Sequence, residues 1–261
     1  MSHHKLEVRN LRYSYPDGQT AIQDMTFTIY HGEAVGIIGA NGAGKSTLLM
    51  LLMGVLFSDS GEVLVGDVRI TKKTLPLIRQ RLGFVFQDPD DQLFMSTVYD
   101  DVAFGPRNYH LDEDEVKHRV NHALDCVGIA HLRDRAPFKL SGGEKRSAAI
   151  AAVLAMHPDV LIMDEPTTAL DPQSRRRVIH FLNSFNHTKI VTSHDLDMIL
   201  ETCSRVLVIK EGKIAADGTA KDILTNAQLL AQCGLEPPLR LQSCPVCSPG
   251  AYEGGLPCES L

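Results

Sequence analysis

The sequence predicts an α/β fold whose mixed sheet is parallel at its centre, and three observations support this class. Short apolar runs at residues 34–39 (AVGIIG), 159–165 (DVLIMDE) and 189–194 (KIVTSH) have the composition of buried parallel strands. Segments of helical character separate such runs, for example residues 172–185 (PQSRRRVIHFLNSF). Residues 6–33 differ, because alternating apolar residues flank the turn PDG and predict an antiparallel β part.

The remaining elements follow in chain order. Residues 45–56 (KSTLLMLLMGVL) read as a helix, residues 61–70 as a pair of hairpin-like strands, and residues 81–87 (RLGFVFQ) as a further strand. A last apolar run, at residues 205–212, again suits a strand. Asp171 before Pro172 is the expected N-cap of the helix at residues 172–185.

A helical subdomain is expected to be inserted at about residues 90–158, where the strand pattern stops. Within it, apolar side chains share one face of a helix at Val116, Val120, Leu124 and Val127. We therefore predict one domain over residues 1–235 that contains this insertion. A tail at residues 236–261, rich in Pro, Gly and Cys, should be irregular.

Composition favours an ordinary globular protein. The 261 residues carry a net charge of −6, which gives no general attraction to nucleic acid. No apolar run approaches the length of about 18 residues that spans a bilayer, and the N-terminus lacks a signal-peptide core. We expect a cytoplasmic protein that reaches any membrane through a partner.

The cysteine-rich tail permits two interpretations. Cys244 and Cys247 form C-x-x-C, Cys258 follows, and His3 and His4 could complete a metal site. A zinc site normally uses four well-spaced ligands, whereas the tail itself offers three. A reduced, flexible tail is the favoured interpretation.

A phosphate-binding loop is the strongest motif. GANGAGKST matches G-x-x-x-x-G-K-[ST] at Gly39, Gly44, Lys45 and Ser46, after a buried strand and before a helix. Main-chain N–H groups should surround the β-phosphate, Lys45 should reach the β and γ oxygens, and Ser46 should bind Mg²⁺. The sequence therefore predicts a P-loop NTPase core.

Two acidic residues end the apolar run VLIM at residues 160–163 and suit the same site. Asp164 is predicted to serve Mg²⁺, directly or through its hydration shell. Glu165 is predicted to act as the general base on the attacking water. By themselves they could simply end a strand at the surface, but the P-loop favours the catalytic interpretation.

A second anion-binding helix start precedes residues 144–157. Ser141, Gly142 and Gly143 (in KLSGGEK) would offer N–H groups and a positive dipole end to a phosphate. The order of P-loop, Gln after a strand, LSGG, Asp-Glu, ALD and a lone His after a strand resembles the ATP-binding cassette ATPases. The resemblance covers residues 5 to 225.

The resemblance implies roles for further residues. Gln87 would contact Mg²⁺ or the attacking water, and His194 would bridge the γ-phosphate and Glu165. Asp171 would lie at the seam of a dimer. Tyr15 would stack on adenine, with Tyr13 as the rival candidate. The loop that contacts ATP would comprise Asn41, Gly42, Ala43, Gly44, Lys45, Ser46 and Thr47, and Mg²⁺ would be served by Ser46, Gln87 and Asp164.

The LSGG stretch implies a dimer, because Ser141, Gly142, Gly143 and Glu144 would face the partner's ATP. The stretch departs from the family pattern at Glu144, where Gln is usual, and at Ser147, where a basic residue is common. Glu144 should favour the helix start while its charge opposes a nearby phosphate.

The stretch FQDPDDQ (residues 86–92) is similar to ATPases of energy-coupling-factor importers, and the chain most resembles the cobalt/nickel members. This implies an ATP- and Mg²⁺-dependent subunit on the cytoplasmic face of the membrane. It would form a homodimer or pair with a paralogous ATPase, and bind integral membrane subunits. A vitamin-type importer and a soluble non-transport ATPase of the same family are the alternatives.

Overall fold

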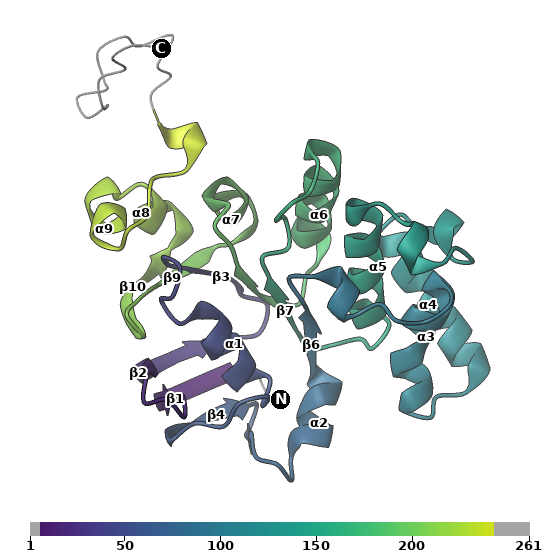
Figure 1. Cartoon of the computed structure of the whole chain (residues 1–261), viewed down its shortest axis with the longest axis horizontal. Helices are drawn as coiled ribbons and strands as arrows, with labels where there is room; N and C mark the ends of the chain where they lie inside the picture. The colour runs from purple at the N-terminus through teal and green to yellow at the C-terminus, as the bar shows by residue number, and fades with distance from the viewer. Residues whose placement is uncertain (1–5, 243–261) are drawn as a thin grey trace.

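The computed structural model describes residues 6–242. His3, His4, Cys244, Cys247 and Cys258, which raised the question of a metal site, lie outside these residues. The described chain forms two sheets and a group of helices (Figure 1).

A six-stranded sheet forms the centre, in the order β10-β9-β3-β8-β7-β6. All neighbouring strands in it are parallel except the edge pair β9 and β10. The predicted mixed sheet with a parallel centre is therefore confirmed. Its strands are β3 (Ala34–Ile38), β6 (Leu82–Val85), β7 (Val160–Asp164), β8 (Thr188–Thr192), β9 (Arg205–Lys210) and β10 (Lys213–Thr219).

A four-stranded antiparallel sheet precedes most of the central sheet in the chain, in the order β2-β1-β4-β5. It confirms the antiparallel part expected from residues 6–33 and the hairpin expected at residues 61–70. Its strands are β1 (Leu6–Ser14), β2 (Thr20–Ile29), β4 (Ser60–Val65) and β5 (Val68–Arg69).

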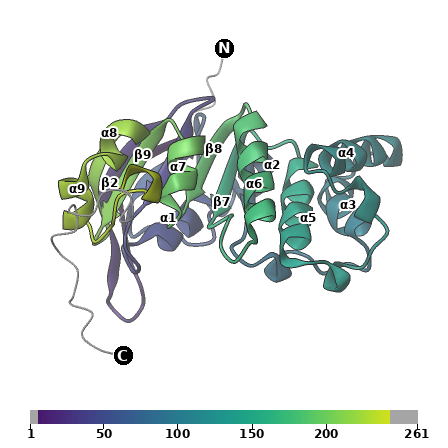
Figure 2. The same ribbon diagram turned by 90° about the horizontal axis from the view of Figure 1, so that it is seen from above.

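The helical subdomain gathers at one end of the molecule. Figures 1 and 2 both place its three helices together there, with the last helices of the chain at the opposite end. The subdomain consists of α3 (Val98–Asn108), α4 (Glu113–Cys126) and α5 (Gly142–Leu154). The predicted apolar face is confirmed, since Val116, Val120, Leu124 and Val127 are all buried.

The other helices pack on the sheets. They are α1 (Lys45–Leu52), α2 (Leu75–Arg81), α6 (Pro172–Ser184), α7 (Leu196–Thr202), α8 (Ala220–Leu224) and α9 (Ala227–Gln232). Asp171 is the N-cap of α6, as the sequence predicts. The sequence patterns predicted no helix at α2, α7, α8 and α9, because five to seven residues give too few turns for a clear helical period.

Short 3₁₀ turns complete the chain at Pro89–Asp91, Ala130–Leu132, Pro137–Lys139 and Leu239–Leu241. The last of them belongs to the stretch that the sequence assigns to an irregular tail. There the main-chain N–H groups of Leu239 and Arg240 donate to Asp197, so this stretch is held on α7.

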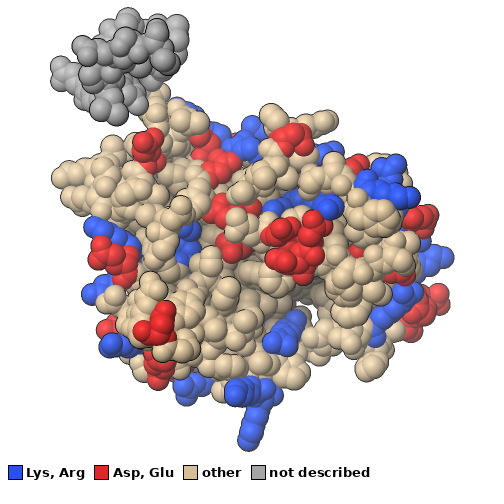
Figure 3. Space-filling model, viewed as in Figure 1, with Lys and Arg blue, Asp and Glu red and all other residues tan. Residues whose placement is uncertain are grey.

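Apart from the edge strand β10, both faces of the central sheet are buried, which explains its continuous apolar strands. In β7, Leu161 and Met163 belong to the core shared with the helical subdomain, while Val160 and Ile162 face the core shared with α1 and the antiparallel sheet. The carboxyl ends of β3, β7 and β8 thereby lie at one edge. None of the described helices is long and apolar enough to cross a bilayer. On the face drawn in Figure 3, acidic and basic side chains are interspersed.

Candidate active site

The loop between β3 and α1 lines a cavity of about 600 Å³. The conformation of this loop requires glycine at two positions. Gly44 has a φ of 107°, and a methyl group at Gly39 would come within 2.3 Å of the Ile209 carbonyl oxygen. Gly44 is also the N-cap of α1 without a side-chain hydrogen bond, so no cap competes for the first N–H groups. All seven loop residues predicted to contact ATP line this cavity, namely Asn41, Gly42, Ala43, Gly44, Lys45, Ser46 and Thr47.

Lys45 is buried at the floor of the cavity. Its Nζ donates to the carbonyl oxygens of Gly39 at 2.7 Å and Ala40 at 3.1 Å, and lies 3.3 Å from His194 Nε2. Burial lowers the pKa of Lys45, and the carboxylates of Glu165 and Asp164 oppose that shift. An ammonium held by main-chain oxygens can exchange them for the oxygens of a phosphate.

Glu165 has the geometry expected of a positioned base. Its φ of 47° is unusual for a residue other than glycine, and its main-chain N–H donates to the Thr192 carbonyl. Three donors hold Oε2, each at 3.2 Å: the hydroxyls of Thr168 and Ser193 and the N–H of His194. Within residues 6–242 nothing donates a hydrogen bond to the buried Oε1, which lies 3.6 Å from His194 Nε2.

The residues predicted to hold Mg²⁺ share the edge of the cavity. Ser46 and Gln87 are exposed there and Asp164 is half-buried, and all three line it. One oxygen of Asp164 accepts a hydrogen bond from the Thr192 hydroxyl, which fixes the carboxylate. Hydroxyl, amide and carboxylate oxygens are the donors that Mg²⁺ prefers, so this set fits the ion.

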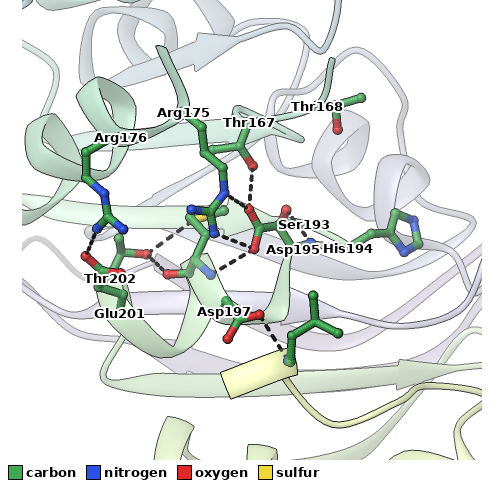
Figure 4. Close-up of polar contacts among 12 residues, drawn as sticks. Thr167, Thr168, Arg175, Arg176, Ser193, His194, Asp195, Asp197, Glu201 and Thr202 are labelled. Atoms are coloured by element: carbon green, nitrogen blue, oxygen red, sulfur yellow. Dashed lines mark hydrogen bonds and ion pairs between the residues drawn. The ribbon is translucent and has the colours of Figure 1, made fainter. Parts of the chain in front are cut away.

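His194 follows β8 and enters the cavity from a loop that several contacts fix. Asp195 caps α7, and its carboxylate accepts from Arg175 at 2.6 and 2.9 Å and from the Thr167 hydroxyl at 3.4 Å. Burial alone would raise the pKa of Asp195, but the hydrogen bonds from Arg175 and the Met198 N–H lower it. In Figure 4 these partners point toward one another, and the His194 ring points away from them.

Tyr15 and Tyr13 lie in different surroundings. Tyr15 lines the cavity, and its hydroxyl lies 2.9 Å from the Thr47 hydroxyl. Tyr13 is buried in the core of the antiparallel sheet and contacts Tyr15 edge-on, with ring centroids 5.1 Å apart. Only the Tyr15 ring therefore adjoins the space where a base could stack.

The start of α5 is stabilised by Glu144, as the sequence predicts. Ser141 and Glu144 form a capping box: Glu144 Oε2 accepts from the Ser141 N–H at 2.7 Å, and Ser141 Oγ accepts from the Glu144 N–H. The hydrogen bond from the Ser141 N–H lowers the pKa of Glu144. The Glu144 carboxylate thus accepts a hydrogen bond from the start of its own helix. The spacing S-x-x-E would have revealed this cap in the sequence.

The two glycines of this helix start have separate roles. A methyl group at Gly143 would collide with Ser174 Oγ at 2.0 Å, so Gly143 allows α5 to pack against α6. Nothing lies within 4 Å of a methyl group at Gly142, which is exposed. Asp171 caps α6 close to this contact by accepting from the N–H groups of Gln173 and Ser174.

The structure does not bring the LSGG residues into the nucleotide cavity of their own chain. The described lining includes none of Ser141, Gly142, Gly143, Glu144 and Asp171, whereas Gly142 lines a neighbouring groove of about 880 Å³. The helix start of α5 is therefore open to another molecule.

Sequence reasoning missed part of the cavity wall. These residues come from the β1–β2 turn, from the start of β2 and from the β9–β10 turn: Gln19, then Thr20, Ala21 and Gln23, then Glu211 and Gly212. Methyl groups at Gly44 and Gly212 would both press on the Ala21 carbonyl, so the three segments meet closely. No local pattern signals this meeting, because it joins residues far apart in the chain.

Comparisons with known proteins agree with this geometry. Residues 22–168 match the family model described as ABC transporter. A protein of Geobacter sulfurreducens named as an ABC transporter ATP-binding protein is 58% identical, with 95% of this chain and 99% of that protein covered. An energy-coupling factor transporter ATP-binding protein, EcfA, of Carboxydothermus hydrogenoformans is 47% identical over 90% of this chain and 87% of its own length.

A solved structure is also similar. It is cbiO1 from Clostridium perfringens, titled as part of the ABC transporter complex cbiONQ. It is 39% identical to this chain and superposes with a TM-score of 0.80, covering 88% of this chain and 94% of its own.

Proposed function

Because this chain belongs to the ABC transporter family and is one of its ATPases, we propose that it drives the import of transition-metal ions, cobalt or nickel. The assembly of Lys45, Glu165 and His194 around a phosphate-binding loop is the observation that carries the ATP-driven part of the proposal. The choice of metal rests on the resemblance of the chain to the cobalt/nickel members of the energy-coupling-factor importers. The relatives named EcfA and cbiO1 support an importer of the energy-coupling-factor type.

Hydrolysis follows from the geometry of the cavity. Lys45 and the N–H groups at the start of α1 hold the phosphates. They position the phosphates for the reaction and neutralise their negative charge. Glu165 Oε1, whose sister oxygen is held by three donors, is free to accept a proton from the attacking water. His194, between Lys45 and Glu165, stabilises the γ-phosphate and keeps the base in place.

Ser46, Gln87 and Asp164 would hold Mg²⁺. The ion neutralises charge on the β and γ oxygens when it is bound. Thr192 keeps Asp164 turned to the cavity edge, and Gln87 stands where the neighbouring groove begins. Gln87 thus links the metal side of the site to that groove.

A dimer would complete the site. The N-terminus of α5 carries a partial positive charge and an exposed Gly142, yet in the described chain it does not line the nucleotide cavity. Two copies, or one copy with a paralogous ATPase, would each cover the other's ATP with Ser141, Gly142 and Gly143. Asp171 would lie at the seam.

The membrane subunits would bind beside Gln87. A groove of about 880 Å³ there is lined by apolar side chains such as Met50, Met53 and Phe86. Beyond it, Phe94 and Phe104 are stacked edge-on and exposed on the surface, at 64% and 45%. Exposed aromatic pairs of this kind suit an apolar partner helix on the cytoplasmic face of the membrane.

A vitamin importer of the same type is the second candidate, because the EcfA relative is named for the energy-coupling factor and not for a metal. The test is to co-express the full chain with the membrane proteins encoded beside its gene. Uptake of labelled cobalt, nickel and a panel of vitamins is then compared with a Glu165→Gln control.

Metal uptake at least about tenfold above the Glu165→Gln control is expected, because removal of a general base typically slows a reaction by 10²–10⁴. Uptake of a vitamin and of neither metal would establish the second candidate. If the chain never co-purified with a membrane protein, a soluble ATPase of this family would be the better description.

A further inference from the structure

Arg146 is a buried charge that the reaction described above does not use. Its side chain lies in the second turn of α5 and the residue is only 2% exposed. Within the described chain no carboxylate forms an ion pair with it, and its Nε finds no acceptor. Burying an unpaired guanidinium is costly, so the contacts that it does make call for an explanation.

Those contacts go to the loop that carries Gln87. One terminal nitrogen of Arg146 donates to the Phe86 carbonyl, and the other donates to the carbonyl of Gln87 itself. The planar guanidinium fork is suited to hold two adjacent carbonyls at once, which the single ammonium of a lysine does less rigidly. Burial lowers the pKa of Arg146, and Asp88 and Asp164 oppose that shift.

Two further contacts join the same loop to α5. Gln92 Nε2 donates to the Ala149 carbonyl at 2.7 Å, and Lys145 pairs with Asp90 at 2.7 Å. Residues 86–92 are thereby bound to α5 along two turns. Arg146 is the member of this set that contacts the main chain of Gln87.

Arg146 also lies close to the open end of its helix. It lies four positions after Gly142, which corresponds to about 6 Å along an α-helix. Gly142, Arg146 and Gln87 line the same groove of about 880 Å³. A displacement of the α5 start is therefore transmitted to Gln87 through one helical turn and the two hydrogen bonds of Arg146.

We propose that Arg146 is a positioning residue that fixes the main chain of Gln87 to α5, so that engagement of the α5 start sets the place of the Gln87 amide in the site. This inference rests on the proposed role of Gln87. It assigns a specific task to a basic residue displaced by one position from the place that is usual in the family.

The test is a double-mutant cycle on the steady-state MgATP hydrolysis of the purified full chain, with Arg146→Lys, Gln87→Ala and the double variant. Arg146→Lys keeps the charge and most of the stem but loses the fork. We expect it to lower kcat about tenfold with little change in KM, in the range of a lost charge-assisted hydrogen bond. In the Gln87→Ala background the same change should leave kcat unaltered.

The matched control is Lys189→Met. Lys189 is likewise buried and donates to two main-chain carbonyls, those of Leu182 and Phe185, but at the far end of α6. We expect this change to lower the urea midpoint without lowering kcat. If Arg146→Lys also lowers the urea midpoint, the comparison with Lys189→Met shows whether a loss of stability alone reduces kcat.

Three results would overturn the inference, and they are distinguishable. If Arg146→Lys turned over like the parent, Arg146 would be a structural residue only. If the two changes multiplied, Arg146 would act by a route that avoids Gln87, and the proposed role of Gln87 would stand. If Gln87→Ala alone left kcat unchanged, the role of Gln87 and this inference would both be wrong.

Discussion

Of the two described helices with glycine at their start, α1 has Gly44 as its N-cap residue, whereas α5 begins at Gly142 and is capped by side chains of its own. Gly44 offers α1 no side-chain cap, and the side chain of Lys45 adds a positive charge beside the free N–H groups. The start of α5 instead has the reciprocal cap of Ser141 and Glu144. The comparison teaches that the first helix start is organised for a tightly held anion, whereas the second is stable before any anion arrives.

The largest expected effect concerns the positive charge beside the start of α1. Lys45→Ala removes the ammonium from the phosphate cavity, and we expect turnover to fall about 10² to 10³-fold with weaker nucleotide binding. Hydrolysis and the titration of a fluorescent ATP analogue measure both effects. Parent-level binding and turnover would show that α1 needs no charge of its own, and the contrast with α5 would disappear.

The next effect tests whether the general base of hydrolysis lies in the cavity beside α1. Glu165→Gln should slow hydrolysis by about 10²-fold, because an amide cannot accept the proton. ATP binding should remain, and an ATP-bound dimer should accumulate on size exclusion. Hydrolysis at the parent rate would contradict the assignment, and a monomer with ATP bound would contradict the role proposed for α5.

The glycines of α5 give a matched pair. Gly143→Ala should lower the free energy of unfolding by about 1–3 kcal/mol, because its methyl group would collide with Ser174. Gly142→Ala should change stability by less than about 1 kcal/mol, since its methyl group meets open space.

Urea unfolding measures this difference between the glycines. Gly142→Ala should nevertheless lower hydrolysis, because its methyl group would stand between α5 and the partner's phosphate. If Gly142→Ala were as active as the parent, α5 would not approach a nucleotide at that residue.

The smallest expected effect concerns the cap of α5. The folded-state pKa of Glu144 is depressed by the Ser141 N–H, so its contribution to stability is present above the unfolded value near 4.5 and is lost as pH falls through the folded value. The urea midpoint of the parent should therefore drop more than that of Glu144→Gln between about pH 6 and pH 3. Equal slopes would show that the carboxylate is not bonded to its own helix.

Much of the candidate site was accessible from local patterns. The P-loop, the Asp-Glu pair at residues 164–165 and the His after β8 each belong to a strand–loop unit whose spacing carries the chemistry. The structure places their side chains at one cavity, because parallel strands end at a common edge. The role of each residue in catalysis remains a prediction that the variants above address.

Local sequence patterns were enough to predict the alternation of strands and helices, the glycines at two helix starts and the acidic pair, since these depend on neighbours within one turn or one strand. Contacts between residues far apart in the chain became visible only in the folded structure. They are Arg146 with the Gln87 carbonyl, Ser174 with Gly143, and Ala21 with Gly44. Only the folded structure, too, shows that Tyr13 is buried and Tyr15 lines the cavity. Burial and close approach depend on which segments pack together, and no local period encodes that packing.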